Sequence, residues 1–404
     1  MTTMPDSGVP VSEAPVSGVP VSGVQELQAH SWADIDLAAV RHNFNLARAL
    51  AAHSRLCAVV KANGYGHGAG RIAAALQPLL QADDLFAVAT LREALSLRQT
   101  IKDTPILIMR GPLDTAEMQR ILAEGFYWVL HSPWQADLLM TALAHGARLA
   151  GSVLNIWLKA NTGMSRLGLP PAELLRIWQA IKAQDSTANL VLMSHLATAD
   201  DTQEMLTPRQ LAAFRELAQT LGLADGSNCT LAASAGILSW PQTHFDIVRP
   251  GIMLYGASPM IGREGPDEGL QPVMNLKSRL IAVNEVKAGD SIGYGATFIC
   301  PQDMRIGVIG IGYGDGYPRH APSGTPVVIH AQGRAWDATL AGRVSMDMLT
   351  VDLTGIPAQA GDEVLLWGQA WGASLPADRI ARQCQTIAYE LFCQITSRVE
   401  FIYR

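Results

Sequence analysis

Residues 57–68 read CAVVKANGYGHG, and their types are suited to carbonyl chemistry. A short apolar run ends at Lys61, and three glycines interleaved with Tyr65 and His67 follow it. A lysine amine can form a Schiff base with a carbonyl when its surroundings keep part of it unprotonated. The glycines let the backbone bend close to a ligand, and the Tyr65 hydroxyl could then contact a phosphate. The alternative is a strand-end lysine in a flexible turn.

Four further motifs place polar residues after apolar runs. They are LKANTGMSRLG (158–168), MSHLATAD (193–200), AASAGIL (232–238) and IVRPGIMLYG (247–256). Because reactive groups lie at the carboxyl ends of the strands in a parallel barrel, these motifs together indicate one site built from several strand ends. Taken singly, Ser234 is an ordinary strand-end serine, Arg249 a surface or salt-bridged arginine and His195 a core histidine.

The elements that would position these residues alternate regularly from about residue 30. Eight apolar runs are typical of strands covered on both faces, and segments such as PAELLRIWQAIKA and PRQLAAFRELAQTL between them have helical patterns. The strand candidates are 55–61, 85–90, 105–110, 127–132, 153–159, 190–195, 228–234 and 246–249. An α/β fold with an N-terminal (β/α)8 barrel of the TIM type is the simplest closure.

A second pattern begins near residue 270, where strand-like runs follow one another between Gly/Asp turns. The runs are SRLIAVNEV, RIGVIGIGYG, TPVVIHA and DEVLLWG, and one late helix, ADRIARQCQTIAYELFCQIT, carries Tyr389. At the other end, SGVPVS occurs twice in a Pro/Ser/Gly/Val segment without helical or strand periodicity. We therefore expect a disordered leader over 1–28, the barrel over 29–268 and a mostly β domain over 269–404.

Composition limits the classes of function. The 404 residues have a formal net charge of −6 and 49% hydrophobic content, with no long basic cluster, which argues against nucleic acid and membrane partners. Five cysteines without a C-x-x-C pair fit neither a disulfide framework nor a zinc site, so we expect no metal. The absence of a signal-peptide pattern then favours the cytoplasm.

Taken together, the motifs resemble alanine racemase, a fold-type III pyridoxal-phosphate enzyme. VRPGIMLYG, GYGAT, GYGDGYPR and GRVSMDM occur in one order, and the resemblance runs from about residue 30 to the C-terminus. It implies pyridoxal 5'-phosphate as cofactor, with Lys61 as both the lysine that carries it and one of two catalytic bases. Further cofactor contacts implied in this way are Tyr65, His195, Ser234, Arg249, Gly251, Ile252 and Tyr389.

Arg249 is the most informative of these positions, because the family places its guanidinium against the pyridine nitrogen. An arginine that is always charged leaves that nitrogen unprotonated and weakens the cofactor as an electron sink. The resemblance further has Tyr65, Tyr389, Ser234, Gly251 and Ile252 bind the phosphate, while His195 packs against the ring and contacts the arginine.

The resemblance also implies how the substrate is held. Arg166 steadies the phenolic oxygen of the cofactor and the substrate carboxylate, and a fork of donors suits both. Lys159 matches a position that many members carry as a carbamylated lysine, which orients this arginine. Two residues later this chain has Asn161 where the usual pattern has aspartate, which leaves the carbamylation of Lys159 open.

From the β domain, the resemblance takes Tyr294 as the second base. Tyr313 would line the substrate entrance, Met346 would offer a backbone N–H to the substrate carboxylate, and Arg319 would support the entrance. The family builds each site from two subunits, so we expect a homodimer with shared active sites.

The reaction implied is racemisation of alanine, for which bases on opposite faces of the α-carbon are the economical arrangement. It would supply D-alanine for peptidoglycan or L-alanine for catabolism. Three alternatives stay open: a barrel decarboxylase, which would require an acidic partner at the pyridine nitrogen; a related racemase of small amino acids such as serine; and a non-catalytic pyridoxal-phosphate barrel.

Overall fold

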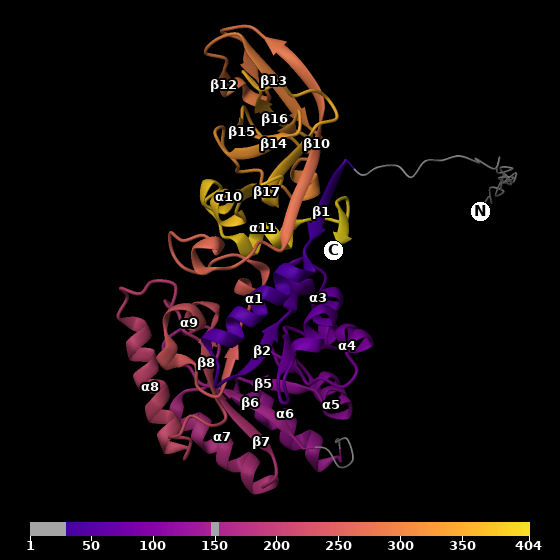
Figure 1. The fold of residues 1–404 in the computed structure, drawn as a ribbon. Helices are drawn as coiled ribbons and strands as arrows, with labels where there is room; N and C mark the ends of the chain where they lie inside the picture. The colour runs from indigo at the N-terminus through magenta and orange to yellow at the C-terminus, as the bar shows by residue number, and fades with distance from the viewer. Residues whose placement is uncertain (1–29, 147–152) are drawn as a thin grey trace, which may run out of the picture.

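The computed structural model describes residues 30–146 and 153–404, which form two bodies, one above the other in Figure 1. The lower body is a barrel wrapped by helices, and the upper body is a twisted sheet. The repeated SGVPVS segment, for which we predicted disorder, lies outside the described residues. Among the described residues, no helix is both long and apolar enough to cross a membrane.

The barrel closes through the eight strands predicted from the apolar runs, all parallel and in chain order. Most of their residues are buried, because side chains fill the interior and helices cover the outside. The strands are β2 (Arg55–Val59), β3 (Leu85–Val88), β4 (Ile106–Ile108), β5 (Tyr127–Leu130), β6 (Asn155–Lys159), β7 (Asn189–Met193), β8 (Cys229–Ala233) and β9 (Ile247–Arg249).

Helices with clear start signals surround the barrel. At the start of α1, Asp36 accepts the N–H groups of Ala38 and Ala39. At the start of α4, Thr90 and Glu93 form a capping box. The two helices predicted over 171–183 and 208–221 are confirmed as α7 and α8. The bounds are α1 (Leu37–Leu50), α2 (Lys61–Tyr65), α3 (Ala69–Leu76), α4 (Leu91–Thr100), α5 (Thr115–Glu124), α6 (Pro133–Ala144), α7 (Pro171–Gln184), α8 (Leu206–Thr220) and α9 (Ser234–Ser239), with 3-10 turns at Gln77–Leu79, Pro241–Thr243, Ile252–Tyr255 and Gly265–Glu268.

The upper body is mostly β, as predicted, and the four predicted runs are confirmed as β10, β13, β14 and β17. Its strands pair mainly antiparallel. Its strand order is β18-β17-β14-β15-β16-β13-β10-β1-β19, and β10 also pairs with β17. The bounds are β1 (Ser31–Ile35), β10 (Met274–Val286), β13 (Met304–Ile309), β14 (Pro326–Ala331), β15 (Arg334–Leu340), β16 (Leu349–Asp352), β17 (Glu363–Ala370), β18 (Ala373–Leu375) and β19 (Glu400–Tyr403), beside a small ladder of β11 (Ser291–Ile292) and β12 (Phe298–Ile299) and 3-10 turns at Tyr294–Ala296 and Tyr313–Asp315.

The strand β1 was not predicted. It comes before the barrel in the chain, yet it pairs antiparallel with β10 and parallel with β19 in the upper sheet. All five of its residues are buried. The segment 29–268, predicted as the barrel, therefore begins with a strand that belongs to the upper sheet. No local pattern indicated β1, because its partners lie far away in sequence.

The late helix predicted over residues 377–396 is two helices, α10 (Ala377–Gln383) and α11 (Ala388–Gln394). The chain turns between them at Gln385, whose φ of 55° is left-handed. A right-handed helix cannot continue through that conformation. Tyr389 consequently lies in the first turn of α11 instead of the second half of one long helix.

Candidate active site

A cavity of about 540 Å³ opens at the carboxyl ends of the barrel strands. It brings together residues predicted from five separate motifs and from α11. Those that line it are Lys61, Tyr65, Arg166, His195, Ser234, Arg249, Gly251, Ile252 and Tyr389. This placement agrees with the expectation that strand ends of one barrel build one site.

Lys61 lies two residues after the end of β2 and points its amine toward the Tyr65 ring, with Nζ 6.0 Å from the ring centroid. Burial lowers its pKa, and the charges of Arg166 and Arg249 lower it further. A larger fraction of the amine is therefore neutral at a given pH than in water, which is the state that attacks a carbonyl or accepts a proton.

One end of the cavity forms a cradle suited to a phosphate. The Ser234 hydroxyl accepts N–H groups from Gly251 (2.9 Å) and Met253 (3.3 Å). A Cβ at position 251 would lie 2.8 Å from the Tyr65 hydroxyl, so only glycine leaves that space open. The Tyr65 and Tyr389 ring centroids are 5.8 Å apart. Burial raises the pKa of both phenols, which keeps them as hydrogen-bond donors.

Arg249 is fully buried in the floor of the cavity. Its Nη1 donates to the Thr230 hydroxyl, and its Nη2 donates to the carbonyls of Ser194 (2.8 Å) and Leu231 (3.0 Å). Its Nε–H has no partner among the described residues. Burial lowers its pKa to about 10, so it stays charged at neutral pH. An unsatisfied buried donor that lines a cavity fits a neutral acceptor such as a pyridine nitrogen.

Positive charge dominates the surroundings of His195 and Lys159. His195 Nδ1 lies 3.4 Å from the Arg249 guanidinium, and burial with that charge holds its pKa well below the usual range, so the ring is neutral. Lys159, at the end of β6, is only 8% exposed. Burial, Arg249 and Arg166 lower its pKa to about 8. Such a field favours an anionic ligand.

Asn161 closes the turn that carries Arg166. The side-chain oxygen of Asn161 accepts the N–H groups of Gly163 (3.1 Å) and Ser165 (3.0 Å), and Ser165 has a left-handed φ of 57°. These bonds need an acceptor oxygen but no charge. The amide at 161 thus closes the turn as a carboxylate would, while leaving the site one negative charge poorer.

The cavity of the same chain includes Tyr389 on α11 but not the other residues predicted from the C-terminal domain, which are Tyr294, Tyr313, Arg319 and Met346. Tyr294 is 70% exposed and Met346 is 52% exposed. Backbone bonds from Tyr313 N to Ser345 O (3.1 Å) and from Gly314 N to Met346 O (2.8 Å) hold Tyr313 beside Met346. Tyr313 and Arg319 also line a shared hollow of about 470 Å³. None of these four residues lines the cavity that contains Lys61 of the same chain.

Several residues of the site were not found from the sequence. Thr230 holds Arg249 from the middle of β8, and a polar residue inside the apolar run NCTLAAS was the available signal. Ile387 reaches the cavity from the break between α10 and α11, which was not predicted. Met109, Met164 and Asp200 also line the cavity.

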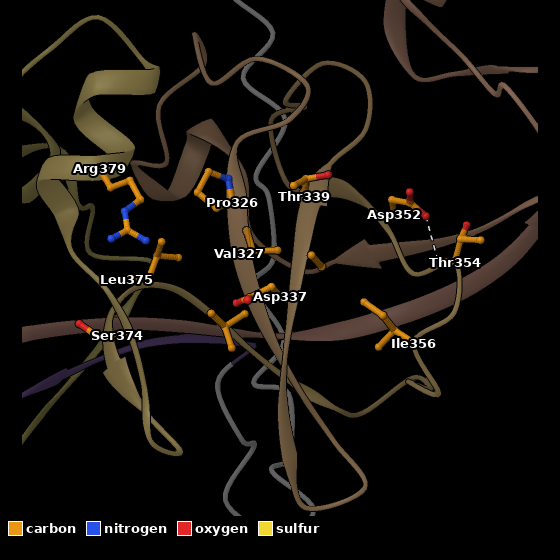
Figure 2. A pocket seen from close by; sticks show the side chains of 12 residues that line it. Pro326, Val327, Asp337, Thr339, Asp352, Thr354, Ile356, Ser374, Leu375 and Arg379 are labelled. Carbon is orange, nitrogen blue, oxygen red and sulfur yellow. Dashed lines mark hydrogen bonds between the residues drawn. The ribbon is translucent and has the colours of Figure 1, made fainter.

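A second hollow, of about 450 Å³, lies in the upper body (Figure 2). Its polar walls include Asp337, Asp352 and Arg379, of which Asp352 accepts the N–H of Thr354 (2.8 Å) and Arg379 donates to Glu264 (2.8 Å). The described residues that line it include no lysine, histidine or cysteine. The barrel cavity is therefore the candidate active site.

Comparison with known proteins agrees with this geometry. Family models for the N-terminal and C-terminal domains of alanine racemase match residues 35–259 and 273–403. The alanine racemase of Nitrosococcus oceani is 46% identical over 369 residues, which cover 91% of this chain and 97% of that protein.

Solved structures are similar over nearly the whole chain. The biosynthetic alanine racemase of Pseudomonas aeruginosa has a TM-score of 0.83 and 41% identity, with 93% of this chain and all of that chain covered. An alanine racemase from Bartonella henselae with covalently bound pyridoxal phosphate has a TM-score of 0.80 and 28% identity, with 93% and 100% covered. The chain belongs to the alanine racemase family.

Proposed function

We propose that this chain binds pyridoxal 5'-phosphate in the barrel cavity and interconverts L- and D-alanine with two bases, Lys61 and Tyr294 of the partner subunit. Lys61 would carry the cofactor, and Arg249 would donate its free Nε–H to the pyridine nitrogen. The cradle of Tyr65, Ser234, Gly251, Ile252 and Tyr389 would hold the phosphate, and neutral His195 would support the ring. The open Nε, the positive field and the cradle support this assignment.

The single observation that carries the proposal is the combination of Lys61 with a fully buried Arg249 whose Nε–H is free and whose partners include no carboxylate among the described residues. A barrel decarboxylase would need an acid at that position. When bound, the cofactor supplies an electron sink that acidifies the α-hydrogen of the substrate, and an unprotonated ring keeps this sink moderate.

The chain's own groups then have defined tasks. Arg166 binds the substrate carboxylate with its fork of donors, and Met346 of the partner subunit adds a backbone N–H. Lys61 and the partner's Tyr294 stand on opposite faces of the α-carbon, so that one takes the proton and the other returns one. The lowered pKa of Lys61 suits the first task.

The positions of the β-domain residues support a homodimer. Tyr294, Tyr313 and Met346 are exposed on the upper body and outside the cavity of their own chain, although the proposed reaction needs them beside Lys61. A two-fold dimer in which each upper body covers the partner's barrel satisfies both facts. The five thiols, four of them buried and none in a disulfide, favour a reducing compartment such as the cytoplasm.

Carbamylation of Lys159 is part of the proposal, because its pKa of about 8 leaves a reactive amine fraction and a carbamate would partly offset the surrounding positive charge. The test is activity at controlled bicarbonate, with Lys159→Ala as control. We expect activity of the parent to rise with bicarbonate and that of Lys159→Ala to stay flat. A flat response in both proteins contradicts the carbamate.

The function is tested with L-alanine in deuterated water. We expect the α-hydrogen to exchange and optical rotation to be lost, with serine slower and bulky amino acids inert. Borohydride should fix the cofactor to the peptide that contains Lys61. No exchange would indicate a non-catalytic barrel, and equal rates with bulky side chains would contradict alanine as the substrate. A D-alanine supply for peptidoglycan and L-alanine catabolism both use this same reaction.

A further inference from the structure

The backbone directly after Lys61 has a rare conformation. Ala62, Asn63, Gly64 and Tyr65 all have left-handed φ values, at 51°, 54°, 64° and 50°. The segment α2 is therefore a left-handed turn, which is unfavourable for residues that carry a Cβ. Three of these four residues do. Such a turn persists only where its surroundings determine it, so the contacts that hold it decide where Lys61 and Tyr65 point.

Glu93 holds the beginning of the turn from α4. One carboxylate oxygen accepts the N–H groups of Ala89 (2.7 Å) and Thr90 (2.9 Å), which is the usual task of a capping-box glutamate. The other oxygen accepts the N–H of Ala62 (2.8 Å). A single carboxylate thereby joins the start of α4 to the residue that follows Lys61.

His67 holds the end of the turn from inside. Its Nδ1 lies 3.1 Å from Gly64 O and 2.8 Å from Tyr65 O, and because both are acceptors, Nδ1 carries the proton. The ring is fully buried between Tyr255 and Phe392, with centroid distances of 4.7 Å and 4.9 Å. Burial lowers its pKa to about 4, so it remains neutral.

The turn has no room to shift as a body. A Cβ at position 66 would lie 2.1 Å from the carbonyl oxygen of Phe392 on α11, the helix that also carries Tyr389. Since the turn cannot shift as a body, loosening either end would instead change its backbone torsions toward right-handed values and rotate Lys61 and Tyr65 away from the cavity.

We propose that Glu93 and His67 are positioning residues that together fix this left-handed turn and so aim the Lys61 amine and the Tyr65 hydroxyl into the cavity. The proposal rests on the function proposed for Lys61 and adds how that lysine is held. Glu93 has a second effect, because its negative charge raises the pKa of Lys61. That effect opposes burial and the charges of Arg166 and Arg249, all of which lower the pKa of Lys61.

Glu93→Gln tests the first contact with little change in shape. The amide oxygen can keep the N–H groups of Ala89 and Thr90, as glutamine does in capping boxes, while its NH₂ then faces the Ala62 N–H and cannot accept it. Glu117→Gln is the matched control, since Glu117 is the N3 residue of α5 and accepts the Leu113 N–H (2.9 Å) away from the turn.

His67→Phe removes the donor and keeps an aromatic ring, whereas His67→Asn keeps an N–H donor near the position of Nδ1. All variants are full-length protein. Amide hydrogen exchange of residues 60–68 reports on the turn, kcat and KM for L-alanine report on the site, and modification of Lys61 by an amine reagent across pH in cofactor-free protein reports on its charge.

We expect Glu93→Gln and His67→Phe to speed exchange in this peptide about tenfold, the effect of losing one hydrogen bond to or from a well-ordered group. We expect kcat to fall at least as much with KM nearly unchanged, His67→Asn to recover most of kcat, and Glu93→Gln to move modification of Lys61 to lower pH. Glu117→Gln should match the parent. If His67→Phe does not fold, Glu93→Gln decides alone.

Parental exchange in residues 60–68 of Glu93→Gln, or faster exchange with an unchanged kcat, would overturn the proposal. Failure of the proposed function is a different result. If borohydride labelled a peptide other than that of Lys61 in the parent, Lys61 would lose its catalytic role, while the exchange data would still show whether Glu93 and His67 hold the turn.

Discussion

At the scale of single residues, the site keeps one buried basic group charged and the basic group beside it neutral. Arg249 is buried without a carboxylate partner among the described residues and keeps its charge, while burial and that charge lower the pKa of His195 beside it and hold the ring neutral. Groups whose environments push their pKa values apart in this way are typical of sites that move protons.

The first prediction concerns Arg249. In Arg249→Glu we expect the ring nitrogen of the cofactor to be protonated, racemisation to fall at least tenfold, and pyruvate from side transamination to rise, because a stronger electron sink delays return of the proton. Pyruvate is measured by coupled reduction to lactate. Arg249→Lys, which retains a positive charge, should lose activity without forming pyruvate. Parental racemisation in Arg249→Glu would contradict the electronic role.

The second prediction concerns His67 and pH. Its pKa falls from 6.5 unfolded to about 4 folded, so the unfolded chain binds a proton first as pH drops. The stability present above pH 6.5 should be lost as pH falls toward 4, by up to about 3 kcal/mol. Urea unfolding of the parent and of His67→Phe at pH 7.5 and 5 measures it. The parent should lose more stability than the variant, and equal losses would exclude His67 as a source.

At the scale of elements, burial explains both what the sequence predicted and what it did not. Eight apolar runs predicted the barrel strands because parallel strands are covered on both faces. Lys61, Arg249 and their neighbours were predictable because each follows such a run. Glu93 was not, because nothing in a capping-box glutamate shows that its second oxygen reaches Ala62. The break at Gln385 was hidden for a similar reason, since no glycine marks its left-handed backbone.

The third prediction tests β1 as a structural strand. Ile35 is fully buried between β10 and β19, so Ile35→Ala should lower the free energy of unfolding by about 2–5 kcal/mol. Ile281→Ala on β10 is the matched control. Ile281 is 44% exposed, and its truncation should cost less than about 1 kcal/mol. Urea unfolding compares the two, and equal losses would show that β1 contributes no more than a surface position.

At the scale of the molecule, the two bodies carry complementary halves of the proposed site. The barrel holds Lys61 and the proposed cradle apart from Tyr389, which comes from α11, and the upper body exposes Tyr294 and Met346. Sequence reasoning placed Lys61 and the other strand-end motifs at one site from their pattern. It assigned Tyr294 and Met346 to the partner's site by resemblance alone, since no local pattern states which chain a residue will face.

The fourth prediction is complementation between inactive variants. Lys61→Ala and Tyr294→Phe proteins are mixed under conditions that permit subunit exchange, so that each mixed dimer has one doubly altered site and one with both parental residues. Random exchange makes about half of the dimers mixed, and roughly a quarter of parental activity should return. Labelled subunits confirm the exchange. No recovery despite exchange would place both bases in one chain.

The position of β1 between β10 and β19 has a consequence for synthesis on the ribosome. This strand emerges before the barrel, but its neighbours emerge after it, and β19 comes among the last residues of the chain. At about 5–20 residues per second, this strand waits on the order of tens of seconds for its partners. The nascent barrel should therefore fold first, with β1 left without its sheet partners until β10 and β19 have emerged.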